Sequence, residues 1–375
     1  MAIRFISKAS RRELAGTAIV RLDFNDQYGW RIEQSAGTLK FLIKKADRVV
    51  ILGHRGRPKP SMHVTADNKQ FSLKGEEKRL ERLMGRKVEF VSHSRISEAA
   101  NEIRNAPHGS VFLLENVRFL DGEEENDIEL ARHLASLGDY YVNEAFANCH
   151  RAHASMAGIT KFIPSYGGLR LEEEIRNLSR VMKKPRHPLV MIFGGAKADS
   201  KLPVIARFRN QADAFLVGGT LGNTLLYLAG TPIGESAAEK TVNGMMLKVA
   251  RMKNVKGLVD MRKRGGKILD IGPKTEKIFM EEIKRAKIIV WNGPLGMIEK
   301  HGFEGGTKAV ARTVARTRAF SVVGGGETVN FIRRIGLAKK IKVKKSNIKI
   351  GEEKKPLGGA ALGEFIHFRR NWGRE

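Results

Sequence analysis

The feature of this sequence that most constrains its fold is a repeated unit. In each unit a short apolar run ends in glycine or polar residues, and a segment with helical spacing follows. The apolar runs predict buried strands, because they are short and are bounded by turn residues. They lie at residues 17–22, 48–52, 87–91, 111–114 and 140–142, then at 188–193, 214–217, 288–291 and 320–323, with a strand and turn at 267–275. The alternation predicts an α/β fold with two doubly wound parallel sheets of the Rossmann-like kind.

The length of the chain, 375 residues, is enough for two domains of ordinary size. Residues 168–182 carry apolar side chains at helical spacing and precede Pro185 and Pro188, which predicts a helix that joins the two domains. Further helices are expected over 38–45, 73–83, 128–137 and 202–208. We expect a first domain over 1–168, a joining helix over 169–184, a second domain over 185–352 and a C-terminal segment over 353–375.

Polar and basic side chains follow the predicted strands of the first half. The carboxyl ends of parallel strands meet at one edge of a sheet, so these residues are expected to lie close together. The set consists of Asp23, Asn25, Arg31, His54, Arg57, Arg118, His150 and Arg151. A pocket with several arginines and histidines would hold a small, multiply charged anion.

In the second half the strand at 188–193 runs into Gly194-Gly195-Ala196-Lys197-Ala198-Asp199-Ser200-Lys201. Glycines let the backbone approach a ligand closely, and free N–H groups at a helix start favour an anion. Lys197 and Lys201 are four residues apart and would share a face of a helical turn, which suits phosphoryl transfer. The spacing is not that of a Walker A loop. A tight turn with two surface lysines is the alternative.

The other strands of the second half also end in glycines. They are followed by Gly218 and Gly219, by Asn292, Gly293 and Pro294 with Glu299 nearby, and by Gly324, Gly325, Gly326, Glu327 and Thr328. Backbone without side chains suits a flat ring, and an acid with a hydroxyl at a helix start suits phosphate oxygens and Mg²⁺. The first half is therefore expected to bind a small acid and the second half a nucleotide.

The formal net charge of +28 predicts attraction to anions, and nucleic acid is one candidate. Lys and Arg are spread along the whole chain without an aromatic–basic pattern, so we expect no nucleic-acid partner beyond nonspecific charge attraction. No apolar run reaches about 18 residues, so no membrane span is expected. A start without an apolar signal core and a single cysteine, Cys149, predict a cytoplasmic location.

Eight motifs, in this order, carry a resemblance to a known family. They are RLDFN, GHRGRP, LLENVRF, YVNEAFANCHRAHAS, GGAKADSK, DIGPKT, WNGPLG and GGGET. From about Thr17 to about Ala338 the chain resembles the phosphoglycerate kinase family. The resemblance implies in-line phosphoryl transfer between 1,3-bisphosphoglycerate and ADP, giving 3-phosphoglycerate and ATP, with Mg²⁺, a hinge closure and a monomeric chain.

The resemblance also implies roles for single residues. Asp23 and Asn25 would contact the glycerate, while Arg31, His54, Arg57, Arg118 and Arg151 would hold its charge. Arg31, Lys197 and Gly326 would be catalytic, with Lys197 at the transferred phosphoryl group and Lys201 at the nucleotide phosphates. Gly218, Gly219 and Gly293 would line the adenosine site, Glu299 would meet the ribose, and Glu327 would meet the metal.

Several positions depart from the family pattern. Glu327 replaces the usual aspartate and is one methylene longer, and Gly53 and Arg55 replace a serine and a leucine. The family's C-terminal serine, threonine and three glycines correspond here only to Pro356–Leu362, after a basic insert at Lys339–Lys355. A catalytically weakened family member that binds nucleotide or phosphoglycerate is therefore the alternative to an active kinase.

Overall fold

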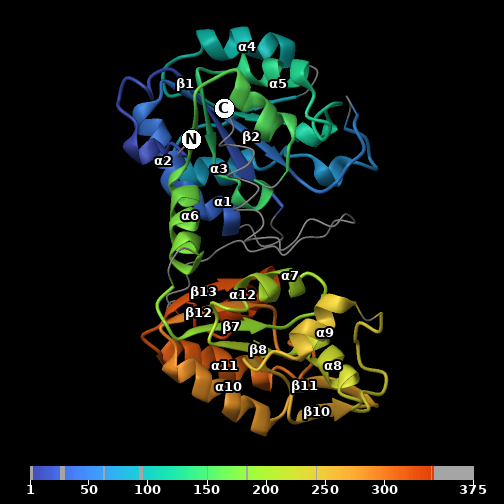
Figure 1. Cartoon of the computed structure of the whole chain (residues 1–375). Coiled ribbons are helices and arrows are strands. Elements are labelled where there is room, and N and C mark those ends of the chain that lie inside the picture. The colour runs from blue at the N-terminus through green and yellow to red at the C-terminus, as the bar shows by residue number, and fades with distance from the viewer. Residues whose placement is uncertain are drawn as a thin grey trace. The chain divides into compact units, whose positions relative to one another are not determined.

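The computed structural model describes residues 3–25, 30–61, 64–92, 96–149, 151–182, 185–241, 243–338 and 340–341. The chain divides into two compact units between Ile175 and Arg176, and each unit is described by itself (Figure 1). His150 and the C-terminal stretch from residue 342, with most of the basic insert and all of Pro356–Leu362, lie outside the described residues. None of the described helices is long and apolar enough to cross a membrane.

The first unit is built on a six-stranded sheet in the order β3-β4-β2-β1-β5-β6, and all its pairings are parallel. The strands are β1 Thr17–Asp23, β2 Arg48–His54, β3 Glu89–Val91, β4 Val111–Leu114, β5 Tyr140–Asn143 and β6 Ser165–Gly167. The helices are α1 Trp30–Gln34, α2 Ala36–Lys45, α3 Glu77–Met84, α4 Ile96–Asn105 and α5 Ile128–Ala135.

Side chains of β1 alternate between the two faces of this sheet, as the period of a strand requires. Ala18, Val20 and Leu22 join an apolar cluster with Leu39 and Leu42 of α2 and Leu80 of α3. Ile19 joins the cluster on the other face, with Ala99 and Ile103 of α4 and Leu134 of α5. Both faces are covered, which is the arrangement that parallel sheets require.

The second unit has a five-stranded parallel sheet in the order β13-β12-β7-β8-β9. Its strands are β7 Leu189–Phe193, β8 Ala214–Val217, β9 Val255–Lys256, β12 Ile288–Asn292 and β13 Phe320–Gly324. The helices are α6 Leu169–Met182, which contains the division between the units, α7 Leu202–Phe208, α8 Gly219–Leu228, α9 Gly244–Ala250, α10 Pro273–Arg285, α11 Gly305–Arg316 and α12 Gly326–Arg334.

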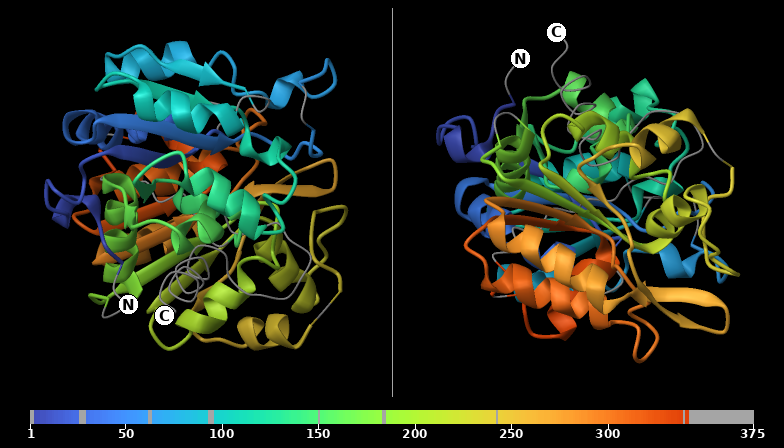
Figure 2. Two further views of the ribbon diagram at one scale, coloured as in Figure 1. Left: turned by 90° about the horizontal axis from the view of Figure 1, so that it is seen from above. Right: turned by 60° about the horizontal axis from the view of Figure 1, so that its bottom comes forward.

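The helices α10 and α11 cover one face of this sheet (Figure 2). Phe279 of α10 and Val310 of α11 pack with Val190 of β7 and Trp291 of β12. The predicted doubly wound α/β fold is therefore confirmed.

Two local expectations differ from the structure. The strand at 267–271, β11, is not in the parallel sheet but pairs antiparallel with β10 Met261–Arg264. Gly265 and Gly266 between them both have positive φ, which favours a tight hairpin turn. The helix expected over 73–83 begins only at Glu77, because Gly75 at φ +100° has left the helical region.

The N-terminus of α6 is capped by a buried carboxylate that follows β5. Oε1 of Glu144 accepts the backbone N–H of Arg170 at 3.0 Å, and Oε2 accepts that of Leu171 at 3.1 Å. The hydroxyl of Thr38 also donates to Glu144. Burial raises the pKa of Glu144 to about 7, although these hydrogen bonds oppose the shift. The sheet edge thus holds the first turn of α6 through one carboxyl group.

This cap predicts a pH dependence of stability. Because the folded-state pKa of Glu144 lies above its ordinary value of 4.5, the folded chain binds the extra proton, and stability falls as pH rises from about 4.5 to 7. Glu144→Gln removes this titration, so the free energy of unfolding of the variant should not show the same fall with pH. The difference in the free energy of unfolding between the parent chain and the variant should therefore become smaller from pH 4.5 to 7. Urea unfolding at a series of pH values measures this. The half-exposed Glu173→Gln serves as the control, and a constant deficit for Glu144→Gln would contradict the prediction.

Candidate active site

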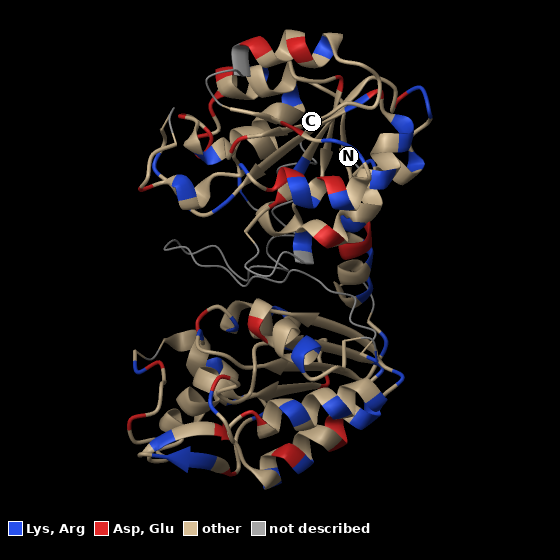
Figure 3. Cartoon of the chain, turned by 180° about the vertical axis from the view of Figure 1, so that it is seen from behind, with Lys and Arg blue, Asp and Glu red and all other residues tan. Residues whose placement is uncertain are grey.

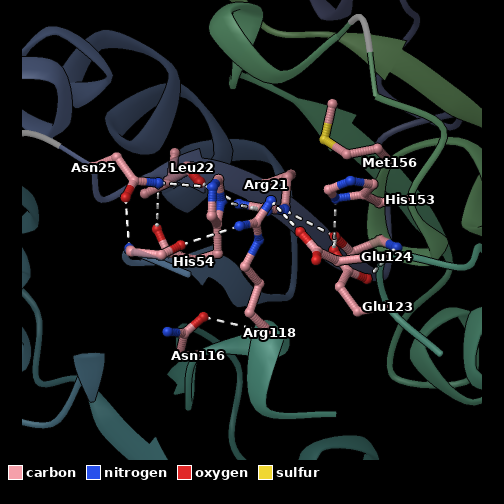
Figure 4. Close-up of polar contacts among 12 residues, drawn as sticks. Arg21, Leu22, Asn25, His54, Asn116, Arg118, Glu123, Glu124, His153 and Met156 are labelled. Carbon is pink, nitrogen blue, oxygen red and sulfur yellow. Dashed lines mark hydrogen bonds and ion pairs between the residues drawn. The ribbon is translucent and has the colours of Figure 1, made fainter. Parts of the chain in front are cut away.

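The first unit gathers a polar cluster at the carboxyl ends of β1 and β2, where Asp23 and His54 are partners in the parallel register. Nδ2 of Asn25 lies 2.7 Å from Nε2 of His54 and donates to the His54 carbonyl at 3.2 Å. The Gly56 N–H donates to Oδ1 of Asn25 at 2.6 Å (Figure 4). The loops after these two strands therefore form one connected surface.

Arginines surround this surface. Arg31 of α1 forms an ion pair with Asp23, which is itself buried. Arg118, in the turn after β4, donates through Nη1 to the Gly56 carbonyl at 3.1 Å and lies 2.7 Å from Oε1 of Glu124. Burial and the charge of Arg151 lower the pKa of Arg118 to about 10. Nε of Arg118 is buried and has no hydrogen-bond partner among the described residues.

Of the residues expected here, Asp23, Asn25, Arg31, His54, Arg118 and Arg151 are brought together. Arg151 is placed by its charge, which acts on both His54 and Arg118. Arg57 is exposed and follows Gly56 directly. His150 is not described.

His54 is a neutral donor or acceptor inside this basic cluster. Its pKa is lowered well below the usual range, first by burial and then by the charges of Arg21, Arg118 and Arg151. Such a group can hydrogen-bond an anion without adding a further charge. Together with the guanidinium groups it forms a site suited to a carboxylate or phosphate.

Sequence reasoning missed three residues that support the cluster. Arg21 lies in the middle of β1 and is 1 % exposed, and its partners are His54 and Ser155. A single cation within an apolar strand was the available signal for it. Glu123 and Ser155 gave no such signal, because they meet Arg21 only through contacts distant in sequence.

In the second unit the loops after β7, β8, β12 and β13 are hydrogen-bonded to one another. The Gly195 N–H donates to the Pro294 carbonyl at 2.7 Å, and the Thr220 N–H donates to the Gly195 carbonyl at 3.1 Å. The Gly293 N–H donates to the Thr328 hydroxyl at 3.1 Å. The glycine-rich stretches therefore share one sheet edge, as expected.

The glycines at this edge allow backbones to touch. A Cβ on Gly194 would lie 2.0 Å from the Pro294 carbonyl oxygen, and one on Gly293 would lie 2.2 Å from that of Gly194. A Cβ on Gly219 would lie 2.7 Å from the backbone of Gly195, and one on Gly218 would lie 2.9 Å from Leu295. A Cβ on Gly326 would meet nothing within 4 Å. Most of these glycines therefore allow neighbouring loops to pack against one another, whereas Gly326 faces open space.

The polar residues of this edge fall into buried and exposed groups. Asn292 and Thr328 are buried, and the Thr328 hydroxyl holds the Gly293 loop. Glu299 and Glu327 are exposed, Glu299 in the loop after β12 and Glu327 in the first turn of α12. Gly324 ends β13, and Gly325 at φ +88° turns the chain into α12.

Two lysines follow the Gly194-Gly195 pair. Lys197 is exposed, whereas Lys201 is 6 % exposed and lies directly before α7. Burial lowers the pKa of Lys201 to about 8; the Glu327 carboxylate opposes this shift and Lys197 adds to it. The three charged groups therefore lie near one another, although α7 begins only at Leu202 and the two lysines do not share a helix.

A metal ion here would have few protein ligands. No group of three or more His, Cys, Asp or Glu side chains suited to a metal occurs among the residues that the structure places. Glu327 fits Mg²⁺, because it is an exposed carboxylate in the first turn of α12. Mg²⁺ binds through one or two carboxylates together with water and substrate phosphates.

A basic anion site on one parallel sheet and a glycine-rich edge with two lysines on another define a two-unit α/β protein of the phosphotransferase class. The family model described as phosphoglycerate kinase matches residues 15–266 and 247–344. This chain belongs to the phosphoglycerate kinase family.

Relatives and solved structures agree with this membership. The chain is 39 % identical over 352 residues to the phosphoglycerate kinase of Pseudothermotoga lettingae, covering 85 % of this chain and 87 % of the relative. It is 35 % identical to that of Dictyoglomus turgidum, covering 98 % and 96 %. The structure of phosphoglycerate kinase from Coxiella burnetii matches with a TM-score of 0.80 at 28 % identity, over 98 % of this chain and 99 % of that chain.

The close approach of the loops predicts that Gly194→Ala damages the second unit. The added methyl group would meet the Pro294 carbonyl oxygen, which can move only with its loop. We expect a loss of about 1–3 kcal/mol in the free energy of unfolding and weaker nucleotide binding. Urea unfolding and calorimetry with ADP measure both. Gly244→Ala is the control, because a Cβ there meets nothing within 4 Å; equal effects of the two substitutions would contradict the prediction.

Proposed function

We propose that this chain catalyses reversible, Mg²⁺-dependent phosphoryl transfer between 1,3-bisphosphoglycerate and ADP, which yields 3-phosphoglycerate and ATP. The observation that carries the proposal is membership of the phosphoglycerate kinase family over most of the chain. The chemistry of the two sheet edges supports it.

The first unit is assigned the three-carbon acid. Asn25 and His54 supply neutral hydrogen-bonding groups 2.7 Å apart, and Asp23 is assigned to the glycerate hydroxyl. Arg31, Arg57, Arg118, Arg151 and His150 are assigned to its negative charges. The unpartnered Nε of Arg118 supports this, because a buried donor without an acceptor is costly until a ligand supplies one.

The second unit is assigned the nucleotide. Gly218, Gly219, Asn292, Gly293, Pro294 and Glu299 are assigned to the nucleoside, and Gly195, Lys201, Gly324, Gly325 and Thr328 to the phosphates and the loops around them. Glu327 would hold the Mg²⁺ that accompanies the nucleotide. When bound, that ion neutralises phosphate charge and orients the phosphate oxygens.

Transfer proceeds in line from the acyl phosphate to ADP without a covalent enzyme intermediate, so the protein mainly positions groups and neutralises charge. Arg31, Lys197 and Gly326 are assigned to the moving phosphoryl group, Lys197 as the mobile cation and Gly326 through its backbone N–H. Because the two substrates are assigned to different units, transfer requires a closed state in which they meet.

A coupled assay with 3-phosphoglycerate and Mg-ATP tests the proposal directly. We expect turnover in the parent chain, and a loss of about 10²-fold in kcat for Lys197→Ala, since a cation at the transition state is removed. The exposed Lys248→Ala on α9 is the matched control. If both ligands bind without turnover, the chain is a family member that only binds them. Glu327→Asp then tests whether the longer carboxylate is the cause.

The pKa of Lys201 predicts how nucleotide affinity depends on pH. Below about pH 8 Lys201 is protonated in the free chain, and above it the charge is lost. We expect the affinity for ADP without metal to fall up to about 10-fold between pH 7 and 9, because the ADP phosphates are already ionised there. Lys201→Arg keeps its charge and should flatten this dependence. Calorimetry measures it, and an unchanged slope in Lys201→Arg would contradict the assignment.

Two further expectations stay predictions. The resemblance implies a monomer, and the single cysteine supports a reducing compartment such as the cytoplasm.

A further inference from the structure

A buried row of polar side chains runs from Glu123 to His54 in the first unit (Figure 4). The Ser155 hydroxyl donates to Oε1 of Glu123 at 2.6 Å, and the Ser155 N–H donates to Oε2 at 2.9 Å. Nε of Arg21 donates to the Ser155 hydroxyl oxygen at 3.0 Å. Nη2 of Arg21 lies 2.8 Å from Nδ1 of His54. Each of these four residues is at most 2 % exposed.

The direction of the contact between Arg21 and His54 is determined. A guanidinium group has only donors, so Nδ1 of His54 must be the acceptor of Arg21. A neutral imidazole carries one proton, which therefore lies on Nε2. Protonation of Nδ1 would place its N–H against a cationic donor that cannot accept, whereas the donor opposite Nε2 is the neutral amide of Asn25. The ring is thus restricted to its neutral form with the proton on Nε2.

We propose that Glu123, Ser155 and Arg21 form a positioning chain that locks His54 as the neutral Nε2–H tautomer and aims this proton at the bound acid. The proposal rests on the assignment of His54 to the phosphoglycerate site. It gives functions to three residues that do not themselves contact the substrate. They act on binding only through the proton position of His54.

The orientation of Arg21 depends on all three of its nitrogen groups. The Ser155 hydroxyl donates its single proton to Glu123, so its lone pairs can accept the hydrogen bond from Nε of Arg21. Nη1 of Arg21 donates to the Leu22 carbonyl at 2.5 Å. Without Ser155 the guanidinium would keep two of three anchors. It would be free to rotate away from Nδ1, and the ring could then change its tautomer.

The Nε2 proton has no acceptor within the described residues. It faces Nδ2 of Asn25, which is also a donor, because Oδ1 of Asn25 is held by the Gly56 N–H. The two nitrogens are 2.7 Å apart, so one anionic oxygen beside the pair could accept a hydrogen bond from both. The locked tautomer therefore matches a carboxylate or phosphate oxygen, and the other tautomer would not.

The charges around the ring favour the same state. Arg21 of β1, Arg118 of the turn after β4, and Arg151 and His153 of the loop after β5 all act on His54, and each disfavours a charged ring. Glu123 lies at the far end of the row, beyond Ser155 and Arg21. Two further titratable groups lie at that end: His153 is 3.7 Å from Glu123, and the Tyr141 hydroxyl donates to the Ser155 carbonyl at 2.9 Å.

Nitrogen-15 NMR of the histidine side chains of the full chain tests the lock directly. The His54 signals are those that disappear in His54→Gln. We expect the Nε2–H tautomer alone, without titration between pH 6 and 8 and without any ligand. A mixture of tautomers, a proton on Nδ1 or an imidazolium at pH 7 would overturn the proposal. This readout does not need turnover, so it fails or succeeds separately from the kinase assignment.

Ser155→Ala tests the chain of contacts. We expect mixed tautomers for His54, a rise of about 3- to 10-fold in KM for 3-phosphoglycerate and an unchanged KM for ATP. Ser72→Ala is the matched control, because Ser72 also donates to a buried glutamate, Glu115, at 2.6 Å. The control should leave the tautomer and both KM values unchanged.

Other outcomes for the variants overturn the proposal. A pure Nε2–H tautomer in a folded Ser155→Ala chain shows that Ser155 does not set the proton position. Equal KM changes in Ser155→Ala and Ser72→Ala show only a general loss of packing. If Ser155→Ala does not fold, Glu123→Gln keeps the size of the side chain and should give the same mixture of tautomers. A pure Nε2–H tautomer in Glu123→Gln would also contradict the proposed positioning chain.

Discussion

Parallel strand pairing is the constraint on which the rest of this structure depends. In each unit the strands point the same way, so every loop that follows a strand lies at the same edge. Helices must then cover both faces, and the apolar runs supply side chains to both. Residues far apart in sequence, such as Gly56 and Arg118, are hydrogen-bonded at this edge because both follow parallel strands.

The two units use this edge in different ways. The first fills it with guanidinium groups, and burial of a charge is costly unless hydrogen bonds replace the lost water. Arg21 meets that requirement with three partners, while Arg118 retains one buried donor without any. The second unit removes side chains instead, so that the Gly194 and Gly293 backbones touch. The first edge therefore keeps a buried donor without a partner, whereas the loops of the second edge close on one another.

The sequence was sufficient for the strands of both parallel sheets that carry the site, because apolar runs bounded by turn residues are a local signal. It placed most of the basic residues correctly for the same reason, since they follow strand ends. The β10-β11 hairpin was missed because Gly265 and Gly266 were not recognised as a turn. The contacts of Arg21 with Ser155 and His54 could not be predicted. They span 134 and 33 residues and depend on side-chain directions that no local pattern records.

A neutral histidine among arginines has a physical reason. If His54 were an imidazolium, it would repel Arg21, Arg118 and Arg151 and would lower the stability of the site in the absence of a ligand. As a neutral donor it gives direction without adding repulsion, and the arginines supply the attraction. The direction of the hydrogen bond then comes from His54, and the electrostatic attraction comes from the arginines. If the site binds the acid as proposed, such a division would let it distinguish the shape of the acid and not only its charge, because hydrogen-bond geometry is specific and a diffuse positive field is not.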